Sequence, residues 1–315
     1  MPHIPVLYQE VLDTLNPIPG GRYVDGTVGA GGHSRGILEL SSPDGKLLGF
    51  DRDPEALALA GNQLAEFGDR VEFVQGSYSD LELHLNNRNW HGIDGILLDL
   101  GLSSMQLDIP ERGFSFRNHG PLDMRFDPDQ PFSAADIINN YSRDDLADLI
   151  YKYGEEKSSR RIADAIIANR PLESTKDLAD IISGAIRRSS RKIHPATQTF
   201  QALRIAVNNE LEALEAFLPQ ALDALKPGGR LAIIAFHSLE DRLVKQFFRR
   251  ESTDCTCPIE IPICVCDHSA QIREISRRPI RPEEKELKVN PRSRSAKLRV
   301  VEKILPKNGT GLAIN

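Results

Sequence analysis

The sequence predicts an α/β fold in which a Rossmann-like sheet domain is interrupted by an all-helical domain. Short apolar runs alternate with helical spacing over residues 22–101, as in parallel strands joined by crossover helices. Residues 109–207 then show helical spacing without an alternating segment, and an apolar run returns at 230–236. We therefore expect a discontinuous sheet domain at 1–108 and 208–305, an inserted helical substrate-recognition domain at 109–207, and a flexible tail at 306–315.

The first predicted strand ends in a glycine-rich loop. Tyr23 and Val24 are typical of a buried strand end, four glycines follow from Gly26 to Gly32, and Ser34 begins a helix. Glycines at this density let the backbone approach a ligand with its N–H groups exposed, and a helix start favours polar or negative groups. The pattern predicts a small polar ligand, although such a turn is often only a turn.

Nearby carboxylates narrow the choice of ligand. A second strand, 46–50, leads into Asp51, which lies 20 residues after Gly31, the spacing at which an acid binds ribose hydroxyls in nucleotide-binding βαβ units. NAD enzymes and methyltransferases both use such an acid. Asp25 disfavours a pyrophosphate and suits a cation, and Ser34 replaces the third small residue of the dinucleotide fingerprint. These features favour S-adenosylmethionine, which carries an ammonium and a sulfonium group.

Two further strands complete this half of the sheet. Pro54 opens a helix whose apolar face extends to Phe67, and a strand at 70–75 precedes Tyr78. The apolar run 95–101 is typical of a strand buried on both faces. Ligands of parallel sheets bind at the carboxyl ends of strands. We therefore expect one crevice to be shared by Asp25, Asp51, Tyr78 and Asp99.

Capping patterns define the helical insert. Ser133 and Ser142 are each followed three residues later by Asp, as in a capping box with Asp in place of Glu or Gln. The second of these helices should close at Gly154. Further helices are expected at 155–169 and 175–188.

The sheet should resume after the insert. A helix at 210–225 precedes a strand at 230–236, His237 stands at the end of that strand, and a last strand at 296–301 should belong to a closing hairpin. At the other end of the chain, residues 3–15 are spaced as a possible lid helix.

Composition and charge limit the class of protein to which the chain can belong. The chain has 315 residues, 40% of them hydrophobic and 27% charged, which is ordinary for a globular protein. No apolar run approaches a membrane span, so we expect a cytoplasmic protein without a membrane partner. A net charge of −6 argues against indiscriminate nucleic-acid binding, but residues 273–303 carry 11 Lys or Arg against 5 Asp or Glu. That excess predicts either a local basic face or a solvated tail.

The four cysteines form one cluster in the sequence. They are Cys255, Cys257, Cys264 and Cys266. A cytosolic protein has little use for disulfides, so the two Cys-x-Cys pairs indicate a tetrahedral structural zinc site. The alternative is a reduced surface loop.

Motifs along nearly the whole chain closely resemble those of the bacterial ribosomal RNA small-subunit methyltransferase H family, also called MraW or RsmH. The matching stretches are His3-x-Pro5-Val6-Leu7, Asp25-Gly26-Thr27-x-Gly29-x-Gly31-Gly32-His33-Ser34, Asp51-Arg52-Asp53-Pro54, Leu98-Asp99-Leu100-Gly101-x-Ser103-Ser104-x-Gln106, Arg112-Gly113-Phe114-Ser115-Phe116, Gly120-Pro121-Leu122-Asp123-Met124-Arg125, Tyr153-Gly154-Glu155-Glu156, His194-Pro195-Ala196-Thr197, Phe236-His237-Ser238-Leu239-Glu240-Asp241-Arg242 and Asn290-Pro291-Arg292-x-Arg294-Ser295. Tyr78 is one departure, since members often have phenylalanine there.

The resemblance implies a class I methyltransferase sheet and a defined activity. Members transfer a methyl group from S-adenosylmethionine to N4 of a cytidine in the decoding region of small-subunit (16S) rRNA, in the cytoplasm. The cofactor contacts that carry over are Gly31, Gly32, His33, Asp51, Tyr78, Asp99 and Gln106.

The chemistry needs an acceptor for a weakly nucleophilic amine. Asp99 is the candidate, and the alternative is that it only contacts the cofactor or caps a turn. Carbon-5 methylation needs a cysteine nucleophile, and the cysteines lie far in sequence from Asp99. His237 is either a substrate contact or a structural residue.

Candidate RNA contacts combine aromatic and basic side chains. They are Phe114, Phe116, Arg117, Arg125, Arg187, Arg188, Arg191 and Lys192. Two other functions stay open: a methyltransferase acting on protein or a small molecule, and an RNA-binding assembly factor that keeps the pocket for structure only.

Overall fold

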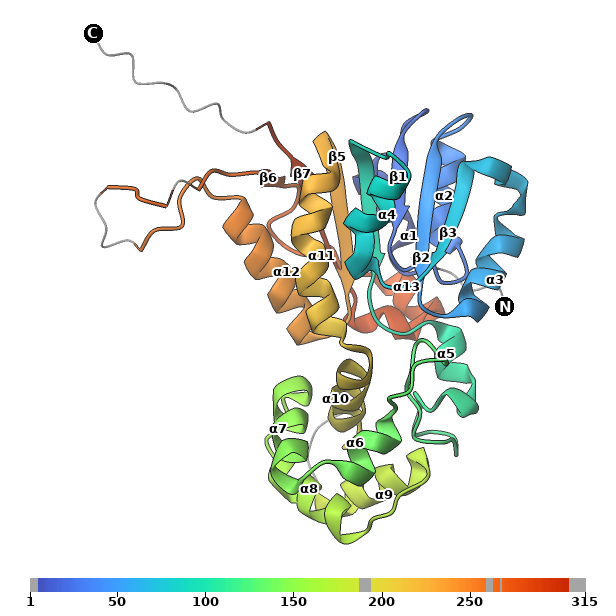
Figure 1. Ribbon diagram of the computed structural model, residues 1–315, viewed down its shortest axis with the longest axis vertical. Coiled ribbons are helices and arrows are strands. Elements are labelled where there is room, and N and C mark those ends of the chain that lie inside the picture. Colours follow the sequence, from blue (N-terminus) through green and yellow to red (C-terminus); the bar gives the residue numbers. More distant parts are fainter. Residues whose placement is uncertain (1–4, 187–193, 259–262, 267, 306–315) are drawn as a thin grey trace. The chain divides into compact units, whose positions relative to one another are not determined.

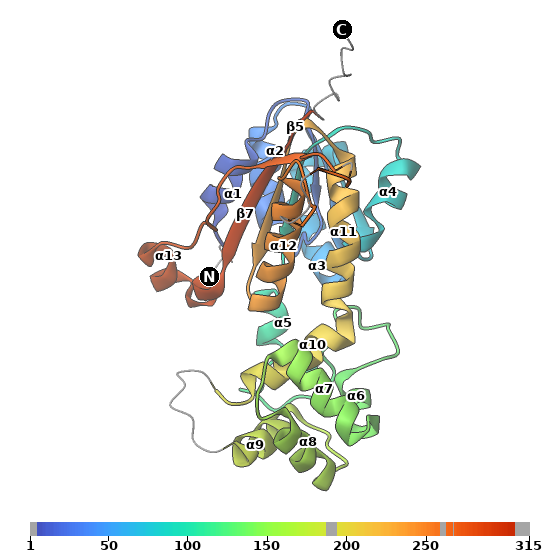
Figure 2. The ribbon, with the colours of Figure 1, turned by 90° about the vertical axis from the view of Figure 1, so that its left-hand side faces the viewer.

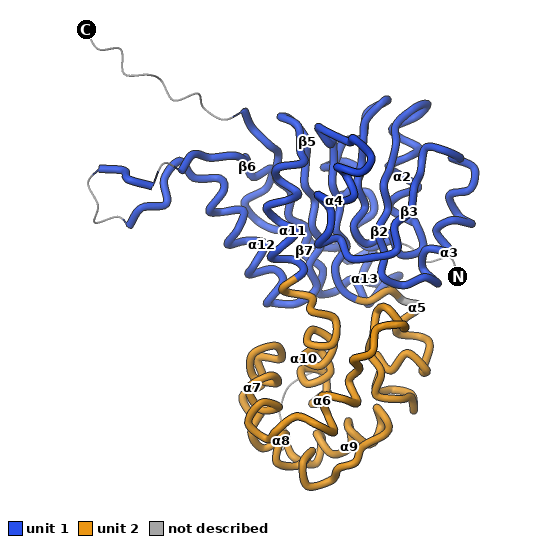
Figure 3. The backbone as a smooth tube through the Cα atoms, in the orientation of Figure 1, with its two compact units in different colours: residues 1–101, 213–315 blue, residues 102–212 orange. Residues whose placement is uncertain are grey.

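The computed structural model describes residues 5–186, 194–258, 263–266 and 268–305. The chain forms two compact units, residues 1–101 with 213–315, and residues 102–212 (Figure 3). The boundaries predicted from the sequence, 109 and 207, lie inside the second unit. The predicted tail at 306–315 and the basic run Arg187, Arg188, Arg191 and Lys192 lie outside the described residues.

The first unit is built on a seven-stranded sheet in the order β3-β2-β1-β4-β5-β7-β6 (Figure 1). The strands are β1 Arg22–Asp25, β2 Lys46–Asp51, β3 Val71–Gln75, β4 Ile93–Asp99, β5 Leu225–Ala235, β6 Ile272–Glu274 and β7 Lys297–Lys303. Neighbours among β1 to β5 pair in parallel, and β7 runs antiparallel to β5 and β6. The strand order reverses between β1 and β4, where ligands of open sheets bind. This is the predicted Rossmann-like, class I methyltransferase sheet.

Helices cover both faces of this sheet (Figure 2). The helices of this unit are α1 Tyr8–Leu15, α2 Gly32–Leu40, α3 Pro54–Gln63, α4 Leu81–Asn87, α11 Glu210–Ala224, α12 Ser238–Glu251 and the short α13 Glu284–Val289, which has no buried residue. Helices α1 and α2 pack into one apolar cluster, and α4, α11 and α12 into another. In β4, Leu97 joins the first cluster and Ile96 and Leu98 the second. Both faces of β4 are therefore buried, which explains its continuous apolar run.

The second unit is helical and has its own apolar core. Its helices are α5 Ser104–Asp108, α6 Ala134–Asn140, α7 Arg143–Gly154, α8 Ser159–Ala168, α9 Thr175–Ala185 and α10 Thr197–Asn208. Ser133 forms the predicted capping box at α6, and the Ser142 hydroxyl accepts a hydrogen bond from the Asp145 N–H at 3.2 Å. The capping box is confirmed at Ser133, and at Ser142 the N-cap is confirmed.

Gly154 does not close α7 as the sequence suggested. The left-handed residue that ends this helix is Glu155, with φ 52°. Gly154 lies where an added Cβ would approach the Gln198 carbonyl oxygen to 2.5 Å. The glycine is therefore required by close packing against α10 and not by the helix end.

Short or irregular elements differ most from the expectations. β6 was not predicted, and α13 and the 3-10 turn Pro291–Ser295 separate it from β7, so the two strands form no tight hairpin. Helix α8 begins at Ser159 and not near residue 155. Within the described ranges, no helix is long and apolar enough to cross a membrane.

Candidate active site

The loop after β1 is held by carboxylates. The Thr27 N–H donates to Asp25 Oδ1 at 3.1 Å, and the Gly29 N–H donates to Asp51 Oδ2 at 2.9 Å. The Gly31 N–H donates to the Val28 carbonyl at 2.8 Å. The expectation that this loop presents its N–H groups to a ligand is therefore wrong for these three, because they satisfy bonds inside the protein.

Asp25 lies beneath the loop and is 1% exposed. The Ser34 hydroxyl, on the first turn of α2, donates to Asp25 Oδ2 at 2.6 Å. Burial raises the pKa of Asp25 to about 6, although hydrogen bonds from Ser34 and Thr27 act in the opposite direction. Ser34 thus occupies the third position of the glycine pattern because it supplies a donor to this acid.

Two glycines of the loop are fixed by close packing. Gly31 has φ 87°, and a Cβ on it would lie 3.1 Å from Leu64. A Cβ on Gly32 would lie 2.5 Å from Pro5. Gly31 is also the N-cap of α2 and offers no side-chain cap, so the start of α2 suits a polar ligand group.

Asp51 ends β2 and is half-buried. Its Oδ2 accepts from Gly29 and its Oδ1 accepts from the Asp53 N–H at 2.9 Å. Burial raises the pKa of Asp51 to about 6 despite these bonds. A carboxylate oxygen can accept a second hydrogen bond, so Asp51 can organise the loop and still bind a ribose hydroxyl.

Asp99 ends β4, beside β1 in the sheet. Its N–H donates to Thr27 Oγ1 at 2.7 Å, which ties β4 to the loop. Oδ1 is buried and has no hydrogen-bond partner in the part of the chain that the structure describes. Burial and the nearby charges of Asp25, Glu240 and Glu286 raise the pKa of Asp99 well above its ordinary value. A buried acceptor without a partner calls for a hydrogen-bond donor, and a bound ligand is one source of it.

His33 forms part of the wall beside Asp99. It is 6% exposed, its Nε2 lies 3.0 Å from the Val6 carbonyl oxygen, and its Nδ1 lies 3.8 Å from Asp99 Oδ2. Because a carbonyl only accepts, we assign the ring proton to Nε2. His33 is therefore bonded to the segment before α1 and lies next to the acid at the end of β4.

Tyr78 belongs to the first unit and Gln106 to the second. Tyr78 begins the 3-10 turn after β3, and its ring meets Phe217 edge-on at 5.3 Å. A Cβ on Gly26 would lie 3.1 Å from Tyr78 Cβ, so Tyr78 lies over the start of the loop. Gln106 belongs to the second unit, where its amide oxygen accepts from the Ser103 N–H at 3.1 Å.

The predicted RNA contacts in the second unit are largely packed. The Phe114 ring is buried and stacks on Phe126, with centroids 5.6 Å apart, and Phe116 stacks on His194 at 4.5 Å. Arg125 binds Asp123 through two guanidinium nitrogens. Phe114 is therefore a packing residue, whereas an RNA contact of the half-buried Phe116 stays a prediction, and Arg117 is exposed.

His237 is a helix cap. Its Nδ1 accepts from the Glu240 N–H at 3.3 Å, and the Glu240 carboxylate accepts from the Phe236 N–H at 2.8 Å. The structural interpretation of His237 is therefore correct. Sequence reasoning missed Glu240, Glu286 and Thr27, although the His237-x-x-Glu240 spacing of a capping box was a signal for the first.

The four cysteines come together. Their sulfur atoms all lie within 4.8 Å of one another. This cluster belongs to the first unit, in the loop between α12 and β6.

A family model described as the MraW methylase family matches residues 1–304. The chain belongs to this family. It is 55% identical to ribosomal RNA small subunit methyltransferase H of Dehalococcoides mccartyi over 304 residues, which cover 96% of this chain and 87% of that protein. It is 53% identical to the protein of the same name from Heliobacterium mobile, over 96% of this chain and 99% of the relative.

A solved rRNA methylase from Streptococcus thermophilus covers 95% of this chain and 94% of its own, at 12% identity and a TM-score of 0.41. That similarity is too low to add to the assignment. As an MraW methylase, the chain is an S-adenosylmethionine-dependent methyltransferase. The unpartnered Asp99 oxygen and the acids at the ends of β1, β2 and β4 fit this cationic cofactor.

Proposed function

We propose that this MraW-family chain methylates N4 of a cytidine in the decoding region of small-subunit (16S) rRNA, with S-adenosylmethionine as methyl donor. The observation that carries the proposal is the buried, unpartnered Oδ1 of Asp99 at the switch point of the sheet. The relatives that share half of its residues are named ribosomal RNA small subunit methyltransferase H. Its place of action is then the cytoplasm, where ribosomes assemble.

The strand-end acids would hold the cofactor. Asp51 would accept from ribose hydroxyls, and Gly31, Gly32 and His33 would form the adjoining wall. Tyr78 is the candidate for contact with the base, and Gln106 remains a candidate from the second unit. When bound, S-adenosylmethionine supplies an electrophilic methyl group beside these acids. Its positive charge would lower the free energy of their ionised forms.

Asp99 would orient the acceptor. The exocyclic amine of cytosine is a poor nucleophile because its lone pair is delocalised into the ring. A hydrogen bond from that amine to the Asp99 carboxylate would fix its direction and would strengthen as the nitrogen becomes positive. The raised pKa of Asp99 also suits it to accept the proton that the nitrogen must lose.

The basic segment 273–303 is the proposed phosphate contact of the first unit. Part of its charge is neutralised, because Lys297 and Arg299 bind Asp241 and Arg273 binds Glu302. Arg292 and Arg294 are exposed on either side of the buried Ser293. We expect their charged groups to contact a phosphate backbone. The helical unit is the proposed substrate-recognition domain, with Arg117 exposed on it.

Labelled methyl transfer tests the proposal. The purified protein is assayed with assembled small subunits, naked rRNA and a protein extract, and the modified nucleotide is mapped by mass spectrometry. We expect an N4-methylated cytidine in the decoding region of the rRNA. Label found only in protein or in small molecules, or cofactor binding without transfer to any acceptor, would contradict the proposal.

A further inference from the structure

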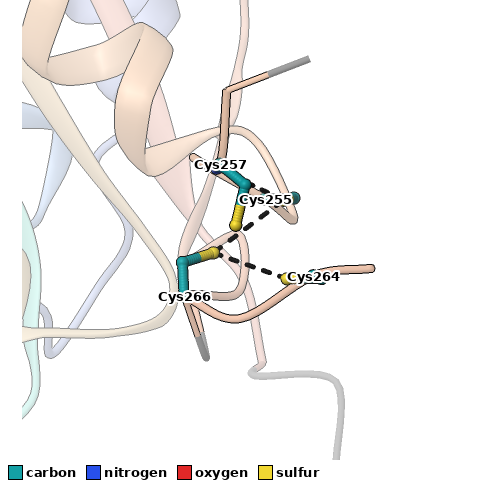
Figure 4. Close-up of side chains that lie close together, drawn as sticks. All are labelled: Cys255, Cys257, Cys264 and Cys266. Carbon is teal, nitrogen blue, oxygen red and sulfur yellow. Dashed lines mark hydrogen bonds between the residues drawn. The ribbon is translucent and has the colours of Figure 1, made fainter. Parts of the chain in front are cut away.

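The four cysteine side chains converge on one point outside the active site (Figure 4). The sulfurs of Cys264 and Cys266 lie 3.5 Å apart, and those of Cys266 and Cys255 lie 3.8 Å apart. Four thiolates at about 2.3 Å from one zinc ion are about 3.8 Å from each other in a regular tetrahedron. All the separations are within 4.8 Å, which is close to the spacing that one zinc ion requires.

Backbone N–H groups already point at these sulfurs. The Cys257 N–H donates to Cys255 Sγ, the Val265 N–H to Cys257 Sγ and the Thr256 N–H to Cys266 Sγ, each at 3.4 Å. Such bonds stabilise thiolates and fix the direction of metal ligands. They do not favour a disulfide, in which sulfur carries no negative charge.

We propose that Cys255, Cys257, Cys264 and Cys266 bind one structural zinc ion, a site separate from methyl transfer. Four thiolates fill a tetrahedral site and leave no position for substrate, as in structural zinc centres. Zinc suits this ligand set because soft thiolates select it over magnesium or calcium.

The ion would hold the loop between α12 and β6. The base of this loop is closed by the Gln271 N–H, which donates to the Glu251 carbonyl at 2.8 Å, and by the Ala270 N–H, which donates to Asp254 Oδ1 at 3.3 Å. Beyond that base, Ile263 and Val265 are 74% and 70% exposed. Apolar side chains this exposed provide little packing, so the metal supplies the cross-links that a core supplies elsewhere.

Metal analysis tests the site directly. Full-length protein is purified without chelator or affinity-tag histidines, and its zinc is measured by inductively coupled plasma mass spectrometry. We expect about one zinc per chain, and less than about one-tenth in a Cys255→Ser/Cys264→Ser variant. Replacement by cobalt should give the visible bands of a tetrahedral thiolate complex.

Val265→Ala is the matched control, because it changes the same loop and keeps all four thiols and the donating N–H. It should retain zinc. Circular dichroism and cofactor binding show whether the serine variant is folded, and limited proteolysis should cut its loop faster than that of the control. A wild-type protein with four free thiols and no bound zinc or cobalt would overturn the proposal, as would two disulfides or an iron centre.

Discussion

The first unit holds carboxylates in two opposite settings. Asp241 accepts from Arg299 Nε and Lys297 Nζ, each at 2.7 Å. Burial raises the pKa of Asp241, but the hydrogen bonds from Arg299 and Lys297 outweigh it, and the pKa falls below its ordinary value. At the strand ends, Asp25, Asp51 and Asp99 are each shifted upward by burial.

The difference separates a structural acid from a ligand-binding one. The cations that stabilise Asp241 are side chains of β7, so its charge is balanced when the chain folds. At the strand ends, hydrogen-bond donors organise Asp25 and Asp51, but burial still dominates. The sulfonium and ammonium groups of S-adenosylmethionine would provide the positive charge that balances the strand-end acids. Strongly perturbed acids gathered at the ligand-binding end of a sheet are candidates for a functional site.

Asp99→Asn should give the largest effect. The amide oxygen can still accept a hydrogen bond, but the negative charge and the capacity to take up a proton are lost. We expect methyl transfer at saturating cofactor to fall by about 100-fold, with a smaller loss of cofactor affinity, since the negative charge beside the cationic cofactor is also removed. Equal losses in transfer and in binding would show that Asp99 only contacts the cofactor.

Asp51→Ala should mainly weaken cofactor binding. Loss of charge-assisted bonds to the ribose corresponds to about 1.5–3 kcal/mol, or about 10- to 100-fold in Kd by calorimetry. Asp51→Asn tests the loop separately, since it keeps an acceptor for a backbone N–H. Asp80→Ala, which removes an exposed acid near the end of β3, should leave the Kd unchanged. Wild-type affinity in Asp51→Ala would exclude the ribose assignment.

Asp241→Asn should affect stability and not chemistry. It removes the partner of Lys297 and Arg299, whose side chains are 25% and 9% exposed. We expect the free energy of unfolding to fall by about 1–2 kcal/mol in urea. Methyl transfer per folded molecule should stay at the wild-type rate. A large loss of transfer would contradict the distinction between a structural acid at Asp241 and ligand-binding acids at the strand ends.

Charge reversal at Arg292 and Arg294 should have the smallest effect. Each phosphate contact contributes about one unit to the slope of log affinity against log salt concentration, so Arg292→Glu/Arg294→Glu should flatten that slope for rRNA by up to about two units. Lys245→Glu/Arg249→Glu makes the same charge change on exposed positions of α12. If both variants behave alike, the segment is only a solvated surface.

Local patterns in the sequence predicted much of this framework. β4 is an apolar run that ends at Asp99, and the Ser133 cap is a four-residue signal, so both could be found without tertiary information. The partners of the loop N–H groups could not, because Asp51 meets Gly29 only when β1 and β2 pair. β6 has three residues and is fixed by pairing with β7, which leaves almost no local signal.

The four cysteines were recognised by spacing, but spacing alone does not say whether sulfurs converge. The unpartnered Oδ1 of Asp99 shows the same limit of prediction from sequence. Its strand and its acid were visible in the sequence, whereas the absence of a partner within the described residues depends on side chains from several elements.

The pH dependence of cofactor binding tests the central claim most directly. In the free protein, Asp25 and Asp51 have pKa values of about 6, above the ordinary 3.8. Their protonated forms therefore favour folding below pH 3.8, and that contribution is lost as the pH rises through about 6. A bound cation should lower both pKa values, so binding near pH 6 should release protons and tighten as the pH rises.

Calorimetry of S-adenosylmethionine binding near pH 6, in buffers of different ionisation enthalpy, measures this proton release. We predict net release of protons and a Kd that falls as the pH rises through about 6. Binding with no proton release and a Kd independent of pH would show that the strand-end acids do not meet the charge of the cofactor, and would contradict the account.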